Sequence, residues 1–173
     1  MRSCSGLVTR VRRFSSGANV TVTGPVTIDD MLESIFSACS SLALLGWLLL
    51  IVLPRQRHAH LVAAVVIPLA IAVVYTVLIA QHFGRSAGGF GSLAAVAQLF
   101  SNPAVLLAGW VHYLAFDLFI GAWEVRDAHR TGVPHLLLVP CLVATFMLGP
   151  IGLLAYWALR TWRTRALTLD AAV

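Results

Sequence analysis

Four hydrophobic stretches, each about as long as a membrane span, follow one another along the chain. A bilayer core of about 30 Å is crossed by roughly 20 residues of α-helix. The stretches cover residues 34–53, 61–80, 103–122, which contains His112 and Asp117, and 136–159. Backbone groups in lipid must be hydrogen-bonded within the chain, and the alternating pattern of a membrane β-barrel is absent. The pattern therefore predicts an all-α fold, a polytopic four-helix transmembrane bundle.

The segments between these stretches predict how the helices are connected. Short segments follow the first and third stretches, which is typical of antiparallel neighbours. The longer segment 81–102 ends in an apolar part, residues 92–100, that is expected to lie as a short interfacial helix. Asn102 followed by Pro103 indicates a helix start, because Asn caps a first turn and Pro fits its first position. We expect one membrane domain, residues 31–165.

The two ends of the chain differ from the hydrophobic domain. Residues 1–30 form a tail rich in Arg and Ser, and residues 166–173 form a short second tail. The first tail resembles an organellar transit peptide. It is equally explained as a flexible tail, or as a start placed upstream of a true start at Met31. We therefore expect the protein in a bacterial inner membrane or, with a transit peptide, in a plastid-type membrane.

The composition supports a membrane protein and excludes a water-soluble enzyme. Of the 173 residues, 59% are hydrophobic and 11% are charged, whereas about a quarter of a soluble domain is charged. All 12 basic residues are Arg, and the net charge is +5. We attribute this charge to orientation in the membrane and to anionic headgroups rather than to nucleic acid. The Arg residues near the spans divide almost evenly between two sides, so their count hardly distinguishes the two orientations. Of the two, we expect the one with both chain ends on the cytoplasmic side or its equivalent.

The fourth hydrophobic stretch contains a strong helix break. Gly149, Pro150 and Gly152 lie close together within it. Proline removes a backbone donor and bends a helix. The break predicts either a kink packed against a neighbouring helix or a cavity at the centre of the bundle.

Two ionisable residues lie inside the predicted spans, and both are candidates for function. An ionisable group in a span costs at least about 2.5 to 3.5 kcal/mol on insertion scales, so His112 and Asp117 require a reason. Five positions correspond to about 140° around a helix, so the two side chains do not share a face. Each one needs a partner from another helix. For His112 the structural alternative is a hydrogen bond between helices.

Asp117 belongs to a stripe along the third stretch that we expect to line an inward-facing groove. Trp110, Tyr113, Gly121 and Glu124 share this stripe at helical spacings of three, four and seven. Without a cation beside it, the carboxyl of Asp117 is expected to be neutral and able to donate a proton. The alternative is that it reaches headgroup water or pairs with an arginine, such as Arg126 or Arg160.

The sequence lacks the residue motifs of several common enzyme classes. His58 and His60 are a pair in a loop without the further histidine boxes of membrane di-iron enzymes, so no metal site is predicted. The motifs of zinc proteases, serine hydrolases and P-loop proteins are absent. Any catalysis is therefore expected to be acid–base chemistry without a metal.

A set of short motifs in the second half of the chain resembles one known family. The motifs are residues 99–103 (Leu-Phe-Ser-Asn-Pro), 110–112 (Trp-Val-His), 117–119 (Asp-Leu-Phe), Trp123, Asp127, 130–132 (Arg-Thr-Gly) and 149–154 (Gly-Pro-Ile-Gly-Leu-Leu). They resemble the abscisic-acid-deficient-four family, which comprises a plant plastid membrane protein associated with neoxanthin formation and its bacterial relatives. A less specific pattern in residues 36–54 extends the resemblance to most of the chain after Met31.

The resemblance implies a four-helix membrane protein linked to the conversion of violaxanthin to neoxanthin. That isomerisation opens an epoxide and forms an allene, and it requires an acid and a base but no redox cofactor. On this hypothesis Asp117 is the proton donor and His112 is the base. The candidate substrate-binding residues are Trp110, Tyr113, Gly121 and Asn102.

A second hypothesis is a non-catalytic membrane module. Such a module would bind a carotenoid, another isoprenoid or a lipid, or it would help a partner membrane enzyme to assemble. The expected partners are membrane lipid, an isoprenoid ligand, and either a second copy of the chain or a partner enzyme. A small transporter is disfavoured, because the spans hold only two ionisable residues and no inverted repeat is evident.

Overall fold

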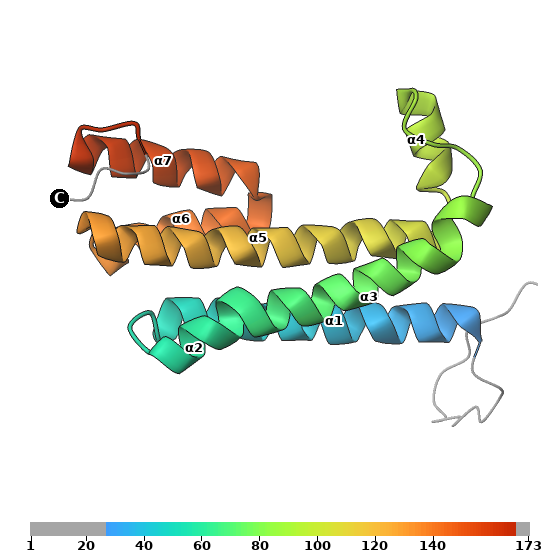
Figure 1. Ribbon diagram of the computed structural model, residues 1–173, viewed down its shortest axis with the longest axis horizontal. Coiled ribbons are helices and arrows are strands. Elements are labelled where there is room, and N and C mark those ends of the chain that lie inside the picture. Colours follow the sequence, from blue (N-terminus) through green and yellow to red (C-terminus); the bar gives the residue numbers. More distant parts are fainter. Residues whose placement is uncertain (1–26, 169–173) are drawn as a thin grey trace, which may run out of the picture.

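The computed structural model describes residues 27–168, and these residues fold into helices joined by short loops (Figure 1). The elements are α1 (Ile28–Val52), α2 (Arg57–Leu61), the π-helical segment η1 (Val62–Val66), α3 (Ile67–His82), the 3₁₀ segment η2 (Phe83–Arg85), α4 (Leu93–Leu99), α5 (Pro103–Thr131), α6 (His135–Leu148) and α7 (Pro150–Thr164). Within residues 27–168 there is no strand. The predicted all-α fold is confirmed.

Three helices are long and apolar enough to cross a membrane. They are α1, the continuous helix Arg57–Arg85 that α2, η1, α3 and η2 form together, and α5. In Figure 1 these three run lengthwise through the molecule. Helix α5 contacts α1, α3, α6 and α7 and contributes the largest share of buried residues. It is therefore the central helix, and it carries both ionisable residues singled out above.

Helix α1 begins earlier than the hydrophobic pattern indicated. The Thr27 hydroxyl accepts a hydrogen bond from the backbone N–H of Asp30 at 3.2 Å, and the Asp30 carboxylate accepts one from the backbone N–H of Thr27 at 3.1 Å. This reciprocal pair is a capping box that starts the helix at Ile28. The helix thus begins before Met31, inside the segment assigned to the tail. The predictions for residues 1–26 lie outside the described residues.

A proline inside the second spanning helix is accommodated by a change of helix type. Pro68 has no N–H and its ring crowds the preceding turn. The five residues Val62–Val66, just before it, are π-helical, and the helix continues on both sides. Residues 57–85 consequently remain one helix despite the proline.

The fourth hydrophobic stretch differs from the prediction, because it forms two helices instead of one. Helix α6 ends at Gly149, whose φ of 47° is in the region that favours glycine, and Pro150 opens α7. The chain reverses there, and α7 returns along α6 (Figure 1). Gly152 permits this close approach, since a Cβ on it would collide with the backbone and side chain of Thr145. The expected kink is a hairpin turn.

The hairpin also changes the expected arrangement of the chain ends. Helices of 14 and 15 residues are about 21 and 23 Å long, too short to cross a core of about 30 Å. The C-terminal end of α7 returns to the end of the molecule where α5 finishes, and α1 begins at the opposite end (Figure 1). The expectation that both chain ends share one side is therefore wrong for the described residues, because it assumed a fourth full span.

Candidate functional site

The candidate residues lie on α5, whose two ends are fixed by local signals that the sequence predicted in part. The Asn102 side-chain oxygen accepts a hydrogen bond from the backbone N–H of Ala104 at 2.9 Å, and its amide nitrogen donates to the Ser86 hydroxyl at 2.9 Å. At the other end Gly132 adopts the left-handed conformation, with φ of 68°. Asn102 thus joins the start of α5 to the preceding loop, and its predicted contact with substrate stays a prediction.

A groove lies between α3, α4 and the first half of α5, and we call it the α3–α5 groove. Its volume is about 570 Å³, within the range of about 300 to 1,000 Å³ that small-molecule sites occupy. The lining is almost entirely apolar or aromatic: Tyr75, Ile79, Phe83, Phe90, Leu99, Phe100, Val105, Leu106, Gly109, Trp110, His112 and Tyr113. Gly109 leaves room for Phe100, the residue that follows α4, since a Cβ there would meet the Phe100 ring at 2.5 Å.

His112 is the ionisable residue among those that line this groove. It lies nine residues after Pro103, about 14 Å along the helix axis. Its ring stacks on Phe116 with 4.5 Å between centroids, and the ring of Tyr75 lies at 5.6 Å. The side chain is exposed and forms no hydrogen bond with the part of the chain that the structure describes. The structural alternative for His112, a hydrogen bond between helices, is thus not observed within residues 27–168.

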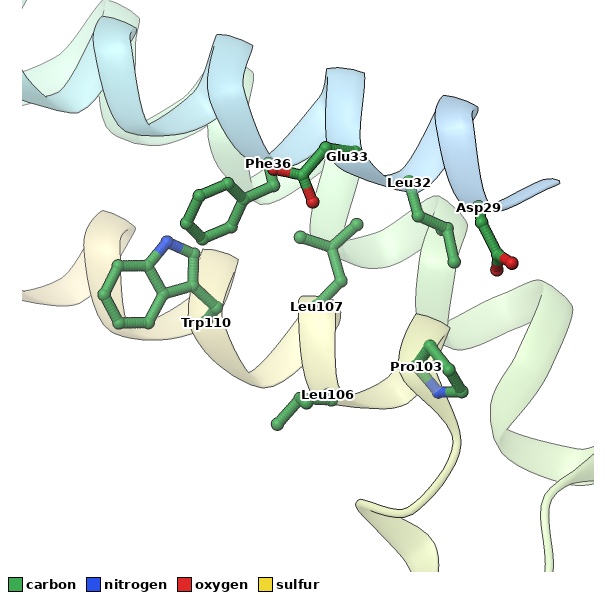
Figure 2. A pocket seen from close by; sticks show the side chains of 8 residues that line it. All are labelled: Asp29, Leu32, Glu33, Phe36, Pro103, Leu106, Leu107 and Trp110. Atoms are coloured by element: carbon green, nitrogen blue, oxygen red, sulfur yellow. The ribbon is translucent and has the colours of Figure 1, made fainter. Parts of the chain in front are cut away.

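Trp110 separates the α3–α5 groove from a second hollow between the first turns of α1 and α5. This α1–α5 hollow has a volume of about 430 Å³ and shares Leu106 and Trp110 with the groove. Figure 2 shows the ring of Phe36 beside that of Trp110, with 5.6 Å between the ring centroids, and the acidic side chains of Asp29 and Glu33 at the rim. The Trp110 indole N–H donates to the Ser40 hydroxyl at 3.2 Å, which fixes the ring between the two cavities.

Tyr113 lines the groove with its ring and ties α5 to the hairpin with its hydroxyl. The hydroxyl donates to the backbone carbonyl of Phe146 at 3.1 Å. Phe146 in turn contacts the ring of Trp47, with centroids 5.6 Å apart. Trp110, Tyr113 and His112 are therefore brought together at one cavity, and their predicted roles with substrate stay predictions.

Asp117 does not line either cavity. Its carboxyl lies against the turn of the hairpin, where a Cβ on Gly149 would meet both carboxyl oxygens at 3.0 Å. One of these oxygens, Oδ2, is buried and has no hydrogen-bond partner among residues 27–168. Asp117 and His112 thus have different surroundings, in agreement with the 140° that separates them around the helix.

Gly121 is covered by an aromatic ring from α1. A Cβ on Gly121 would come within 2.5 Å of the Trp47 ring, and Gly121 is itself buried. This position allows α1 and α5 to pack closely. The predicted contact of Gly121 with substrate stays a prediction.

A buried polar cluster joins the second half of α5 to the hairpin, and it was not predicted from the sequence. The Thr145 hydroxyl donates to Glu124 Oε1 at 2.9 Å. Asp127 Oδ2 accepts from the Tyr156 hydroxyl at 2.6 Å and from Arg160 Nε at 2.7 Å. Arg160 was considered as a partner of Asp117, and the structure pairs it with Asp127. The signal available in the sequence was an arginine directly after the fourth hydrophobic stretch, residues 136–159.

Comparison with protein-family models gives a match over residues 34–156, which is most of the chain. The matching model is described as ABA DEFICIENT 4-like. The chain belongs to the ABA DEFICIENT 4-like family. This result confirms the resemblance that the motifs indicated. No curated protein and no solved structure matches the chain.

The matched region of this ABA DEFICIENT 4-like protein contains the whole α3–α5 groove and the turn of the hairpin. Several motif residues have structural roles here: Asn102 caps α5, Gly132 ends it, Gly149 forms the turn and Asp127 anchors α7. His112 also belongs to a motif, but it lines the groove and neither caps a helix, forms a turn nor anchors another helix in the described chain.

Among residues 27–168, no three His, Cys, Asp or Glu side chains lie close enough together to hold a metal ion.

Proposed function

We propose that this protein binds a carotenoid-type isoprenoid in the α3–α5 groove and isomerises one of its end groups there. The observation that carries the proposal is an aromatic groove along the membrane-spanning helix α5, with the exposed imidazole of His112 in its lining. Flat aromatic and aliphatic walls suit an apolar polyene that arrives from the lipid. Membership of the ABA DEFICIENT 4-like family supports a carotenoid as the ligand.

The chemistry is the conversion of an epoxide to an allene, as in the change from violaxanthin to neoxanthin. A base removes a hydrogen from the carbon of the polyene chain next to the ring. The released electron pair forms the new double bond, the carbon–oxygen bond of the epoxide breaks, and the oxygen takes up a proton. No atom is lost and no electron is supplied from outside, so the reaction is an isomerisation.

Within this proposal His112 is the base, because its imidazole reaches the groove and can accept a proton. Asp117 is the proton donor of the sequence hypothesis. It lies one turn from Tyr113 on α5, and Tyr113 lines the groove.

A second candidate function is binding without turnover, including assistance to a partner membrane enzyme. The observation that favours it is the separation of Asp117 from the groove that contains His112. A binding module needs only the aromatic lining. The membrane location follows from the three apolar helices, whereas a plastid-type or bacterial inner membrane stays a prediction, as do a second copy of the chain or a partner enzyme.

The two functions are separated by expressing the chain in cells that accumulate violaxanthin and analysing their xanthophylls by chromatography. An isomerase produces neoxanthin, and His112→Gln abolishes it at equal protein level. His58→Gln, an exposed histidine outside both cavities, is the matched control and leaves the product unchanged. Asp117→Asn lowers the yield if Asp117 supplies the proton. Unchanged xanthophylls with the wild-type protein present in the membrane would reject the isomerase and leave the binding function.

A further inference from the structure

A small hollow lies at the end of the molecule opposite the α3–α5 groove, where α1 passes into α2 and α5 nears its end. We call it the basic hollow. It has a volume of about 370 Å³ and is lined by Pro54, Arg55, Gln56, Arg57, His60 and His129. Helix α2 begins the second spanning helix at Arg57. The hollow is therefore at the boundary between the bilayer core and the headgroups.

The lining of the basic hollow carries positive charge with no carboxylate to balance it. Two of its six residues are arginines and two are histidines, and none is Asp or Glu. The acidic groups of α5 at this end are buried elsewhere, Glu124 against Thr145 and Asp127 against Tyr156 and Arg160. Arg126 adds a further positive charge that acts on the His60 ring.

The two histidines of the hollow differ in their hydrogen bonds. His129 Nε2 lies 3.0 Å from the carbonyl of Pro54, and since a carbonyl only accepts, this nitrogen carries the hydrogen. That bond holds the α1–α2 loop against α5. In contrast, His60 Nδ1 is buried and has no partner within the described chain. A buried polar atom without a partner is costly, and its need is met by a ligand or water.

We propose that the basic hollow binds the phosphate group of an anionic ligand, for which the source nearest at hand is the headgroup of a membrane lipid. The guanidinium groups of Arg55 and Arg57 provide paired donors that match phosphate oxygens. His60 lines the same hollow and adds an imidazole beside the two arginines. Basic pockets at the cytoplasmic surface of membrane proteins recognise phosphate headgroups through this combination of charge and position.

The test measures lipid retention by the full-length purified protein in detergent, using native mass spectrometry with phosphatidylglycerol or phosphatidylcholine added. The wild type is expected to retain phosphatidylglycerol in preference. Arg55→Gln and Arg57→Gln each weaken this binding about tenfold or more, as expected for a lost hydrogen bond to a charged group. Arg130→Gln is the matched control, because it removes the same charge from an exposed site on α5 outside the hollow.

A second arm identifies the source of the phosphate. If inorganic phosphate at millimolar concentration displaces the lipid from the wild type but not the residual lipid from Arg55→Gln, the hollow accepts a free phosphate as well as a headgroup. Retention of lipid under the same conditions assigns the headgroup alone. The proposal is overturned if the two lipids are retained equally, or if Arg130→Gln weakens binding as much as Arg55→Gln. Neither result bears on the groove, which lies at the other end of the molecule.

Discussion

Asp127 balances a buried positive charge, and this role can be tested by a single isosteric change. The Asp127 and Arg160 side chains are almost completely buried and 2.7 Å apart. Removing one partner of a buried ion pair leaves an uncompensated charge, at a cost of about 3 to 5 kcal/mol. We therefore expect Asp127→Asn to lower the free energy of unfolding by about 3 kcal/mol, measured by titration with SDS in mixed micelles.

The neighbouring residue supplies the control for this prediction. Arg126 is exposed, so Arg126→Gln is expected to change the free energy of unfolding by no more than about 0.5 kcal/mol. Equal effects of the two substitutions would contradict the assigned role of Asp127.

The sequence predicted some residue environments and not others, for a physical reason. The angle between His112 and Asp117 follows from helix geometry alone, and the structure places them in different surroundings. The partner of Arg160 depends on the direction in which α7 runs, which no local pattern specifies. The position of α1 beside α5 is likewise not specified by a local pattern. Gly121 was therefore expected to face a groove, whereas Trp47 of α1 covers it.

At the scale of elements, the hairpin of α6 and α7 depends on one close contact. Gly152 leaves no room for a side chain beside Thr145. Forcing extra atoms into a packed interface costs about 1 to 3 kcal/mol. Gly152→Ala is thus expected to lower the thermal unfolding temperature in detergent, whereas Gly84→Ala, where a Cβ would meet nothing within 4 Å, leaves it nearly unchanged. A stable Gly152→Ala variant would show that the helices are not packed as described.

The ends of elements were predicted where a local signal specifies them. Asn102 and Pro103 start α5, and Ser92 caps α4 through a hydrogen bond from Ala95 N–H at 3.1 Å. The break at Gly149 was also recognised. The reversal of the chain at this break was not predicted, because the same Gly and Pro residues are compatible with a kink and with a reversal. The contact between Gly152 and Thr145 distinguishes the two.

At the scale of the whole molecule, the hairpin changes the count of arginines at the two ends, which the sequence alone had left almost equal. The returning α7 adds its arginines to the end that already holds those of the two short loops: Arg55, Arg57, Arg126, Arg130, Arg160, Arg163 and Arg165. Among the described residues, the other end has Arg85 with Asp29, Asp30 and Glu33. Positive charge favours the cytoplasmic side. The Arg-rich end is therefore expected to face the cytoplasm or its equivalent.

Single cysteines in a cysteine-free background test this topology through labelling by an impermeant maleimide. His58→Cys and Leu167→Cys are expected to react from the same side of the membrane, and Gly89→Cys from the other. A fourth spanning helix would instead place Leu167→Cys on the side of Gly89→Cys, so that result would contradict the hairpin.

The central claim is that the α3–α5 groove holds a carotenoid-type ligand, and the most direct measurement is the pigment that copurifies with the protein from carotenoid-accumulating cells. Ile79 lines the groove, so Ile79→Trp fills it. Val77, two residues away on α3, is 48% exposed and lies outside the groove, which makes Val77→Trp the matched control. We predict that the wild type and Val77→Trp retain pigment in their absorption spectra and that Ile79→Trp loses it. Equal pigment in all three proteins, or none in the wild type, would contradict the claim.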